Sequence, residues 1–381
     1  MPNCDAAILD AIRSRSGQAS RKEIQQATGL SWGTMCAQIN QLLSDGTLLS
    51  ERLQPAGRGR PVLSLRLNQQ ARYMVGLDIG ASQTKIVICD LAFRVMHQQV
   101  LPTPYYQGEK HFFAWLSGRV QDCLQNSGLA RDKIRGLCAA VSGNVDSENG
   151  VLVSGGNFGI SWGADLPLAA RLSERCQLPV CSVTTQAAAA WAEYHFGEHA
   201  GCGNLVTIGL GVGIGSGVVA NHRLLISQPG RPIGYIGHLL MPGNKHICTC
   251  GFRGCLEAYS GAHFLRQAAR DQLPHRPELH DARALDQAAA TGDPDAVEMM
   301  NLAASYNAIG IASMVQLYSP DAIVFSGGQS QPQGYVYQQT IQAINGILPV
   351  ERRSRMKFSL SRLGVIQSAL GAARLAYEKF I

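Results

Sequence analysis

The sequence has no apolar run long enough to cross a lipid bilayer. Its longest runs, such as Gly136–Val141 and Ala187–Ala192, are far shorter than the roughly 20 apolar residues that a membrane-spanning helix needs. The first five residues, Met-Pro-Asn-Cys-Asp, also lack the charged and then apolar pattern of a secretory signal peptide. We therefore expect a cytoplasmic protein that does not contact a membrane.

The chain also lacks a strong charge of either sign. It holds 33 Lys and Arg against 27 Asp and Glu, a net charge of +6, which alone is weak evidence for a polyanionic partner. Residues 1–70 carry eight basic and five acidic side chains, so half of the excess lies in less than a fifth of the chain. A length of 381 residues indicates two or three domains, and the charge asymmetry hints that the N-terminal domain contacts a polyanion.

Eleven cysteines occur without an export signal, which favours reduced or metal-bound thiols over disulfides. Three of them, Cys248, Cys250 and Cys255, follow His238 within eighteen residues. Three thiolates and one imidazole form a tetrahedral zinc set, and four protein ligands leave no open coordination position. We therefore predict a structural Zn²⁺ bound by these four residues. The alternative is that the three cysteines are ordinary buried side chains.

Residues 1–70 predict three helices followed by two strands. The helices are expected over Ala6–Arg15, Arg21–Thr28 and 32–44, and the strands over Leu48–Arg52 and Val62–Leu67. The second helix begins with a Ser-x-x-Glu capping box, and a serine precedes the third. Two short helices joined by a Thr-Gly-Leu turn indicate a helix-turn-helix, and the two strands indicate a wing.

In such a unit the third helix enters the major groove of DNA. Glutamine side chains can bond an adenine edge there, and basic side chains outside this helix would contact phosphates. A Gly-Arg-Gly-Arg-Pro arm at 57–61 suits a narrow A·T-rich minor groove. The candidate DNA-binding residues are Arg21, Lys22, Trp32, Thr34, Gln38, Gln41, Arg58 and Arg60. The alternative is a basic linker on a helical module that binds protein.

Two motifs carry a resemblance to a known family. Residues 238–257 read His-x9-Cys-x-Cys-Gly-x-x-Gly-Cys-x-Glu, which resembles the zinc motif of the ROK family of sugar kinases and sugar-responsive repressors. The N-terminal segments Thr28–Ser31 and Gly59–Pro61 are similar to the winged helix that precedes the ROK domain in the repressor branch. Kinases of this family usually lack that extension, so the resemblance favours a repressor.

The resemblance implies an α/β architecture: an N-terminal winged helix-turn-helix followed by a two-lobed, actin-like and hexokinase-like ROK domain with a zinc loop. We expect the DNA-binding domain over residues 1–70. The first lobe is expected over 71–195, with a C-terminal helix at about 366–381 returning to it. The second lobe is expected over 196–365, with the zinc loop at 238–257.

Three positions depart from the family's kinases. The two phosphate loops contain Ala81 and Val212, where the resemblance implies a glycine and a threonine. The catalytic aspartate of the family corresponds to Thr185. A threonine hydroxyl cannot accept a proton near neutral pH, so general-base catalysis worth on the order of 10²–10⁴-fold is lost. We therefore predict that this protein is not an enzyme.

The same resemblance implies a sugar-binding cleft. Its candidate ligand-binding residues are Asn157, Thr184, Thr185, Tyr235, His238 and Glu257. His238 would bind zinc through one ring nitrogen and the sugar through the other. Tyr235 stands where the family has a glutamate, and it either contacts an altered ligand or only packs.

We interpret the chain as a transcriptional regulator of carbohydrate metabolism, and as a repressor by resemblance. It would bind operator DNA as a homodimer, and a sugar or sugar phosphate would alter the spacing of its winged helices by closing the cleft. One alternative is an active ROK sugar kinase with a regulatory DNA-binding arm. Another is a regulator controlled by a protein partner.

Overall fold

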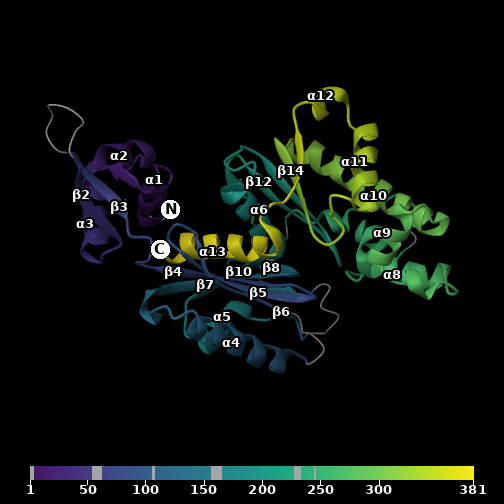
Figure 1. The fold of residues 1–381 in the computed structure, drawn as a ribbon, viewed down its shortest axis with the longest axis horizontal. Helices are drawn as coiled ribbons and strands as arrows, with labels where there is room; N and C mark the ends of the chain where they lie inside the picture. The colour runs from purple at the N-terminus through teal and green to yellow at the C-terminus, as the bar shows by residue number, and fades with distance from the viewer. Residues whose placement is uncertain (1–3, 54–61, 105–107, 156–164, 227–232, 244–245) are drawn as a thin grey trace.

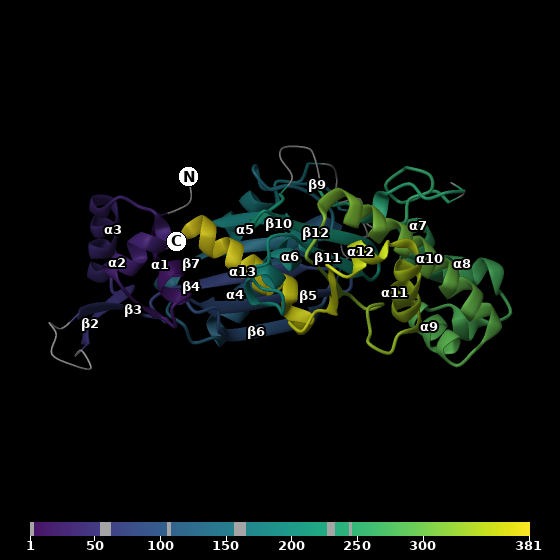
Figure 2. The same ribbon diagram turned by 90° about the horizontal axis from the view of Figure 1, so that it is seen from above.

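The computed structural model describes residues 4–53, 62–104, 108–155, 165–226, 233–243 and 246–381. Figures 1 and 2 show an elongated molecule with a small N-terminal unit at one end and two α/β lobes beyond it. Among the helices in these ranges, none is both long and apolar enough to cross a membrane.

The N-terminal unit packs three helices against a three-stranded antiparallel sheet of order β1-β3-β2. The elements are α1 (Cys4–Arg13), β1 (Gln18–Ser20), α2 (Arg21–Thr28), α3 (Trp32–Ser44), β2 (Leu48–Leu53) and β3 (Val62–Leu67). Ile8, Ile12, Ile24, Ile39 and Leu65 are fully buried and form the centre of its core.

Local hydrogen bonds fix the ends of α2 and α3. The side chain of Ser20 accepts from the backbone of Glu23, whose carboxylate accepts from the backbone of Ser20 at 2.7 Å, so the capping box is confirmed. Gly29 ends α2 in the left-handed conformation at φ 66°, which glycine adopts without strain. The expected first helix was displaced by two residues: α1 begins at Cys4 and ends at Arg13, and a turn at Ser16 and Gly17 follows it.

The first lobe is built on a five-stranded sheet of order β10-β7-β4-β5-β6. Its strands are β4 (Tyr73–Ile79), β5 (Gln83–Asp90), β6 (Val95–Pro102), β7 (Ile134–Val141) and β10 (Val180–Thr184). Helices α4 (Gly108–Asn126) and α5 (Leu168–Cys176) cover one face, and α6 (Thr185–Phe196) and α13 (Gln367–Phe380) cover the other (Figure 1). A short hairpin, β8 (Asn144–Asp146) and β9 (Val151–Ser154), follows β7.

The second lobe repeats this architecture with a sheet of order β13-β12-β11-β14-β15. Its strands are β11 (Leu205–Leu210), β12 (Ile214–Ala220), β13 (Arg223–Leu224), β14 (Ala322–Ser326) and β15 (Lys357–Leu360). Its helices are α7 (Glu257–Ser260), α8 (Ala262–Gln272), α9 (Ala282–Ala290), α10 (Pro294–Tyr318), α11 (Tyr335–Ile347) and α12 (Val350–Arg353). The long helix α10 packs on α11 and buries Ile311 and Met314 against the sheet.

Helices α6 and α13 lie between the two sheets and approach each other closely (Figure 2). A Cβ atom at Gly371 of α13 would lie 1.8 Å from the carbonyl oxygen of Ala188 in α6. A Cβ atom at Gly217 of β12 would lie 2.0 Å from the carbonyl oxygen of Gln186 in α6. Because both distances are shorter than any real contact, glycine is required at these positions. Helix α6 therefore contacts the first lobe and the second lobe at once.

A buried ion cluster joins α1 to α13. Arg374 donates to both carboxylate oxygens of Asp10, at 2.9 and 2.6 Å. Its Nε lies 3.0 Å from Glu378 and 3.3 Å from the Nε2 atom of His195, at the end of α6. The Tyr377 hydroxyl donates to the carbonyl of Ala6 at 3.0 Å. The N-terminal unit is thus bonded to the C-terminal helix across more than 360 positions of sequence.

The pKa of His195 makes this cluster sensitive to pH. Burial, together with the Arg374 guanidinium, lowers the pKa of His195 to about 3. The folded protein therefore holds this imidazole neutral, whereas an unfolded histidine is protonated below about pH 6.5. Stability from this group is present above that value and is lost as the pH falls from about 6.5 toward 3, at up to about 1.4 kcal/mol per pH unit.

We predict that His195→Gln flattens the pH dependence of stability, because glutamine keeps an acceptor for Arg374 but does not titrate. The measurement is the urea midpoint at about pH 7 and about pH 5.5. Wild type should lose more stability between these values than the variant. His111→Gln, an exposed change on α4, serves as the control and should follow wild type. Parallel losses in wild type and His195→Gln would contradict the prediction.

Candidate metal centre, ligand cleft and DNA-contact surface

The loop after β12 brings one histidine and three cysteines together. His238 ends a short 3-10 helix, η4 (Ile236–His238), and the ligand atoms of His238, Cys248, Cys250 and Cys255 all lie within 4.8 Å of one another. The Nδ1 atom of His238 is 3.8 Å from Sγ of Cys248, and the Sγ atoms of Cys250 and Cys255 are 3.6 Å apart. Tetrahedral ligands about 2.3 Å from zinc are separated by about 3.8 Å, so this donor set fits zinc.

The protonation of the thiols supports the same assignment. Burial, followed by interaction with the neighbouring Cys250 thiol, raises the pKa of Cys255 above its usual range. Burial also raises the pKa of Cys248. Without a cation, the Cys248 and Cys255 thiols are therefore held neutral. A bound divalent cation reverses this preference, because a coordinating thiol loses its proton. These residues can hold a metal ion in a site closed by four protein ligands.

Tyr235 spans the space between the lobes. Its hydroxyl donates to the carbonyl oxygen of Gly143, in the loop after β7, at 2.7 Å. Its ring stacks on His238 with centroids 5.6 Å apart and an interplanar angle of 23°. Burial raises the pKa of Tyr235, so the hydroxyl remains a neutral donor. The metal loop of the second lobe is thereby connected to the first lobe through one side chain.

Glu257 holds the glycine-rich turn of the second lobe in place. This buried residue begins α7, and its carboxylate accepts from the backbone N–H of Ile214 at 2.7 Å. That N–H lies directly after the turn at 211–213, which joins β11 to β12. The negative charge of Glu257 therefore lies against the part of the second lobe that was expected to receive phosphate.

At the equivalent edge of the first lobe, Thr185 lies beside a carboxylate that sequence reasoning did not identify. The hydroxyl of Thr185 donates to Oδ1 of Asp78 at 3.3 Å, and Lys85 donates to Oδ2 at 2.8 Å. Asp78 is 1% exposed, so its charge is compensated inside the protein by Lys85. Thr184 caps α6 by accepting from Ala187 at 3.1 Å, and its O–H donates to no group among the described residues.

Gln186 is a further cleft residue that the sequence did not single out. A Cβ atom at Gly209 would lie 2.4 Å from its Nε2 atom, and one at Gly215 would lie 2.7 Å from its Cγ atom. The side chain thus rests on the two facing glycines of the β11–β12 hairpin. Its Oε1 atom is buried and has no hydrogen-bond partner among the described residues. The available signal was a long polar residue next to Thr184 and Thr185.

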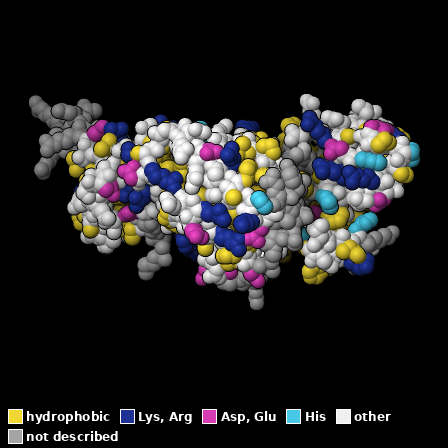
Figure 3. Space-filling view, turned by 90° about the horizontal axis from the view of Figure 1, so that it is seen from below, with side chains coloured by type: hydrophobic (Ala, Val, Ile, Leu, Met, Phe, Trp, Pro, Cys, Tyr) yellow, Lys and Arg dark blue, Asp and Glu magenta, His cyan; other side chains and the backbone are white. Residues whose placement is uncertain are grey.

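The predicted DNA-contact residues lie on two helices of the N-terminal unit. Trp32 is 50% exposed, Thr34 and Gln41 are exposed, and Gln38 is half-buried. Lys22 is exposed on α2, whereas Arg21 donates to Asn40 of α3 at 2.8 Å and ties the two helices together. Figure 3 shows basic and acidic side chains interspersed over this end of the molecule. The predicted contacts Arg58 and Arg60 and the predicted ligand residue Asn157 lie outside the described residues.

Comparison with known proteins assigns the family. Residues 74–379 match the sequence profile of the ROK family. The chain belongs to the ROK family. It is 22% identical to the xylose repressor of Bacillus subtilis over 370 aligned residues. The alignment covers 96% of this chain and 93% of the repressor. It is 27% identical to a glucokinase of Halalkalibacterium halodurans over 320 aligned residues. The alignment covers 81% of this chain and 96% of the glucokinase.

Solved structures show the same relationship. A ROK family transcriptional regulator, a homologue of the Escherichia coli Mlc protein, superposes with a TM-score of 0.81 at 22% identity and covers 99% of this chain and 96% of its own. A ROK hexokinase of Thermus thermophilus superposes with a TM-score of 0.65 at 30% identity and covers 81% of this chain and 98% of its own. The expected actin-like, hexokinase-like α/β fold of a ROK protein is confirmed.

We predict that Cys255→Ser removes bound zinc, because Cys255 is a fully buried member of the cluster. Zinc per chain, measured by elemental mass spectrometry after purification, should fall from about one to near zero, and the melting temperature should fall with it. Cys202→Ser, which alters a thiol outside the cluster, should leave both values unchanged. Full zinc content in Cys255→Ser would show that these residues do not form the site.

Proposed function

We propose that this ROK protein is a sugar-responsive transcriptional repressor of carbohydrate metabolism. The observation that carries the proposal is a capped helix pair, α2 and α3, joined to a ROK domain and presenting exposed polar side chains on α3. The ROK profile begins at residue 74, so this pair belongs to an additional N-terminal unit. Repressors are among the relatives that match nearly the whole chain.

We propose that residues 1–70 form a winged helix-turn-helix that binds operator DNA as a homodimer in the cytoplasm. Helix α3 would enter the major groove, where Gln38 and Gln41 contact base edges beside Trp32 and Thr34. Lys22 would contact phosphates, and the arm at 57–61 would lie in the minor groove. Arg21 would act mainly by fixing α2 to α3, because its guanidinium already bonds Asn40.

We further propose that the cleft between residues 71–195 and 196–365 binds a sugar or sugar phosphate. Xylose repressors and glucokinases among the relatives support this ligand class. The O–H of Thr184 donates to no group among the described residues. His238 faces Cys248 through Nδ1, so Nε2 of the same ring points away from the candidate metal centre. A structural zinc at His238 would orient this ring and supply no reaction chemistry.

Electrostatics argue against phosphoryl transfer in this cleft. The candidate base position is Thr185, and the adjacent Asp78 is paired with Lys85 at 2.8 Å. Lys85 is paired with Asp78, the carboxylate that a catalytic Mg²⁺ would need as a ligand. The glucokinase relatives make a kinase the alternative function, and a partner-controlled regulator is the second alternative.

We predict that Gln41→Ala weakens binding to the protein's own promoter DNA by about 5- to 150-fold, because one bidentate base contact contributes about 1–3 kcal/mol. Gln38→Ala should act in the same direction, and both effects should be specific to sequence. Fluorescence anisotropy with promoter DNA and a scrambled duplex is the measurement. Gln125→Ala, an exposed change on α4, is the control. Equal binding by Gln41→Ala and wild type would exclude α3 as the reading helix.

We predict no sugar-dependent ATP consumption by the purified protein, while a sugar changes its affinity for promoter DNA. A panel of sugars and sugar phosphates, including xylose and glucose, is added to the DNA-binding assay, and ADP is measured in the same tubes. Sugar-dependent ADP formation that disappears in Asp78→Asn would show that Asp78 acts in the reaction and would establish the kinase alternative. Specific DNA binding that no sugar alters would favour control by a protein partner.

A further inference from the structure

Helix α6 connects the cleft with the N-terminal unit. At its first turn Thr184, Thr185 and Gln186 lie at the cleft, against Asp78 and the β11–β12 hairpin. The helix holds 12 residues, which corresponds to a length of about 18 Å. Its last turns carry a tryptophan and a histidine that reach the buried ion cluster. One rigid element therefore contacts both places.

The contacts at the far end of α6 converge on Arg374. The indole N–H of Trp191 donates to Glu378 at 2.9 Å, and the ring of His195 accepts from Arg374 at 3.3 Å. Arg374 is 5% exposed, so its charge must keep an acidic partner inside the protein. Two acids share it: Glu378 on its own helix, and Asp10 on α1. The position of α6 thus acts directly on the partners of Arg374.

Further contacts fix α1 to the same side of the first lobe. The Tyr377 hydroxyl donates to Ala6, and Arg13 donates to the carbonyl of Leu91 at 2.8 Å. The guanidinium of Arg13 lies 4.7 Å from the centroids of both Phe93 and Tyr377. Helix α1 is therefore the element through which the N-terminal unit contacts the rest of the chain most closely.

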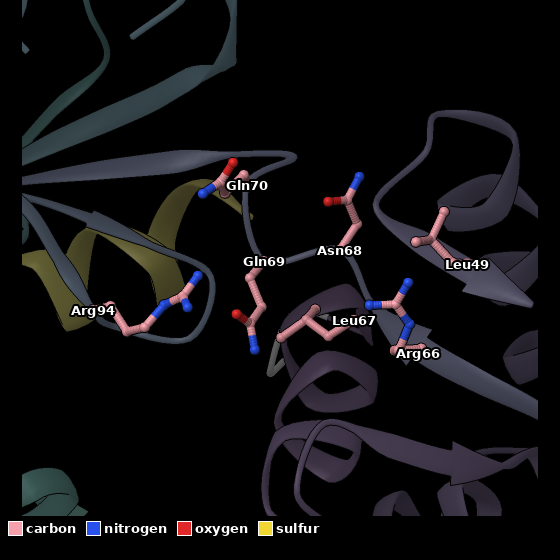
Figure 4. A pocket seen from close by; sticks show the side chains of 7 residues that line it. All are labelled: Leu49, Arg66, Leu67, Asn68, Gln69, Gln70 and Arg94. Carbon is pink, nitrogen blue, oxygen red and sulfur yellow. The ribbon is translucent and has the colours of Figure 1, made fainter. Parts of the chain in front are cut away.

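A hollow lies beside the junction, which is also crossed by an ion pair between Arg72 and Asp45 at 2.6 Å. Figure 4 shows a polar hollow between β3 and the start of the first lobe. It is lined by Leu49, Arg66, Leu67, Asn68, Gln69, Gln70 and Arg94. Because the buried apolar core of the N-terminal unit is continuous with that of the first lobe, a change in orientation at this junction would be a small shift about the α1 contacts.

We propose that the Asp10–Arg374 contact transmits the ligand state of the cleft to the N-terminal unit, through α6 and its contacts to Glu378 and Arg374. This inference rests on the proposed function. Ligand binding at the first turn of α6 moves the helix. Its last turn then changes how the guanidinium of Arg374 is divided between Asp10 and Glu378, and α1 changes its orientation as a result. A small shift is sufficient, because a buried guanidinium with two carboxylate partners has discrete arrangements rather than a continuum.

The first test compares coupling in Asp10→Asn and wild type. Asparagine removes the charge of Asp10 but keeps its size, and Asp122→Asn, which breaks a surface pair with Arg119, is the matched control. The full-length proteins are titrated with promoter DNA, with and without xylose or glucose, and sugar affinity is measured separately by calorimetry. We expect Asp10→Asn to keep its sugar affinity within about 2-fold, while the sugar-induced change in DNA affinity falls at least about 5-fold toward one.

The outcomes separate this inference from the function on which it rests. If wild type responds to sugar and Asp10→Asn responds equally, the inference is wrong and the proposed function stands. If Asp10→Asn does not fold, Tyr377→Phe replaces it, because this variant removes the hydroxyl bond between α13 and Ala6 of α1. If wild type responds to neither sugar, the proposed response to these sugars is wrong, and a test without ligand decides the inference.

That second test perturbs α6 and observes α1. Trp191→Phe removes the indole N–H that donates to Glu378, and hydrogen exchange is followed over residues 4–13. We expect faster exchange of α1 by at least about 3-fold, with unchanged exchange in α4. Trp115→Phe, a tryptophan of α4 packed in the first lobe, is the matched control. Unchanged exchange of α1 in Trp191→Phe would overturn the proposal.

Discussion

The backbone contact between α6 and α13 is the constraint on which the rest of the structure depends. Gly371 brings α13 against the carbonyl of Ala188, and Gly76 of β4 receives the carbonyl of Ala369 from the other side, where a Cβ atom would lie at 1.8 Å. Helix α13 is therefore packed between β4 and α6, and at Gly76 and Gly371 there is no space for a side chain. Because α6 also packs on β12 of the second lobe, the geometry of both lobes and of the N-terminal unit is set at this crossing.

The parts of this architecture that the sequence predicted are those encoded by local chemistry. Helices α2 and α3 have their expected bounds because serine caps and Gly29 fix their ends. The two strands of the wing were expected over Leu48–Arg52 and Val62–Leu67, and the structure has β2 and β3 at Leu48–Leu53 and Val62–Leu67. Strand β1 was not expected, because three residues are too few to show a period of two.

The unpredicted parts of the site depend on residues that meet only in three dimensions. Spacing was enough to group His238 with its three cysteines, because these residues lie close in sequence. Asp78 and Thr185 are 107 positions apart, and Asp10 and Arg374 are 364 apart. Each pair forms where a strand end or a helix end is placed by the sheet order, which no local pattern records.

The metal centre and the ion cluster are related through the two ends of the cleft. Tyr235 stacks on His238 and donates to Gly143, and Gly143 directly follows Ser142, whose hydroxyl lies 3.4 Å from that of Thr185. The ring of Tyr235, which stacks on the candidate metal ligand His238, is therefore linked to Thr185 in the first turn of α6 through Gly143 and Ser142. The last turn of α6 contacts Arg374 of α13 through His195. A change in the cleft that displaces Tyr235 from Gly143 would therefore also act on α6, and through Arg374 on the N-terminal unit. Under the proposed function, a metal ion bound at His238 would thus stabilise one of two lobe arrangements whose populations ligand binding would shift.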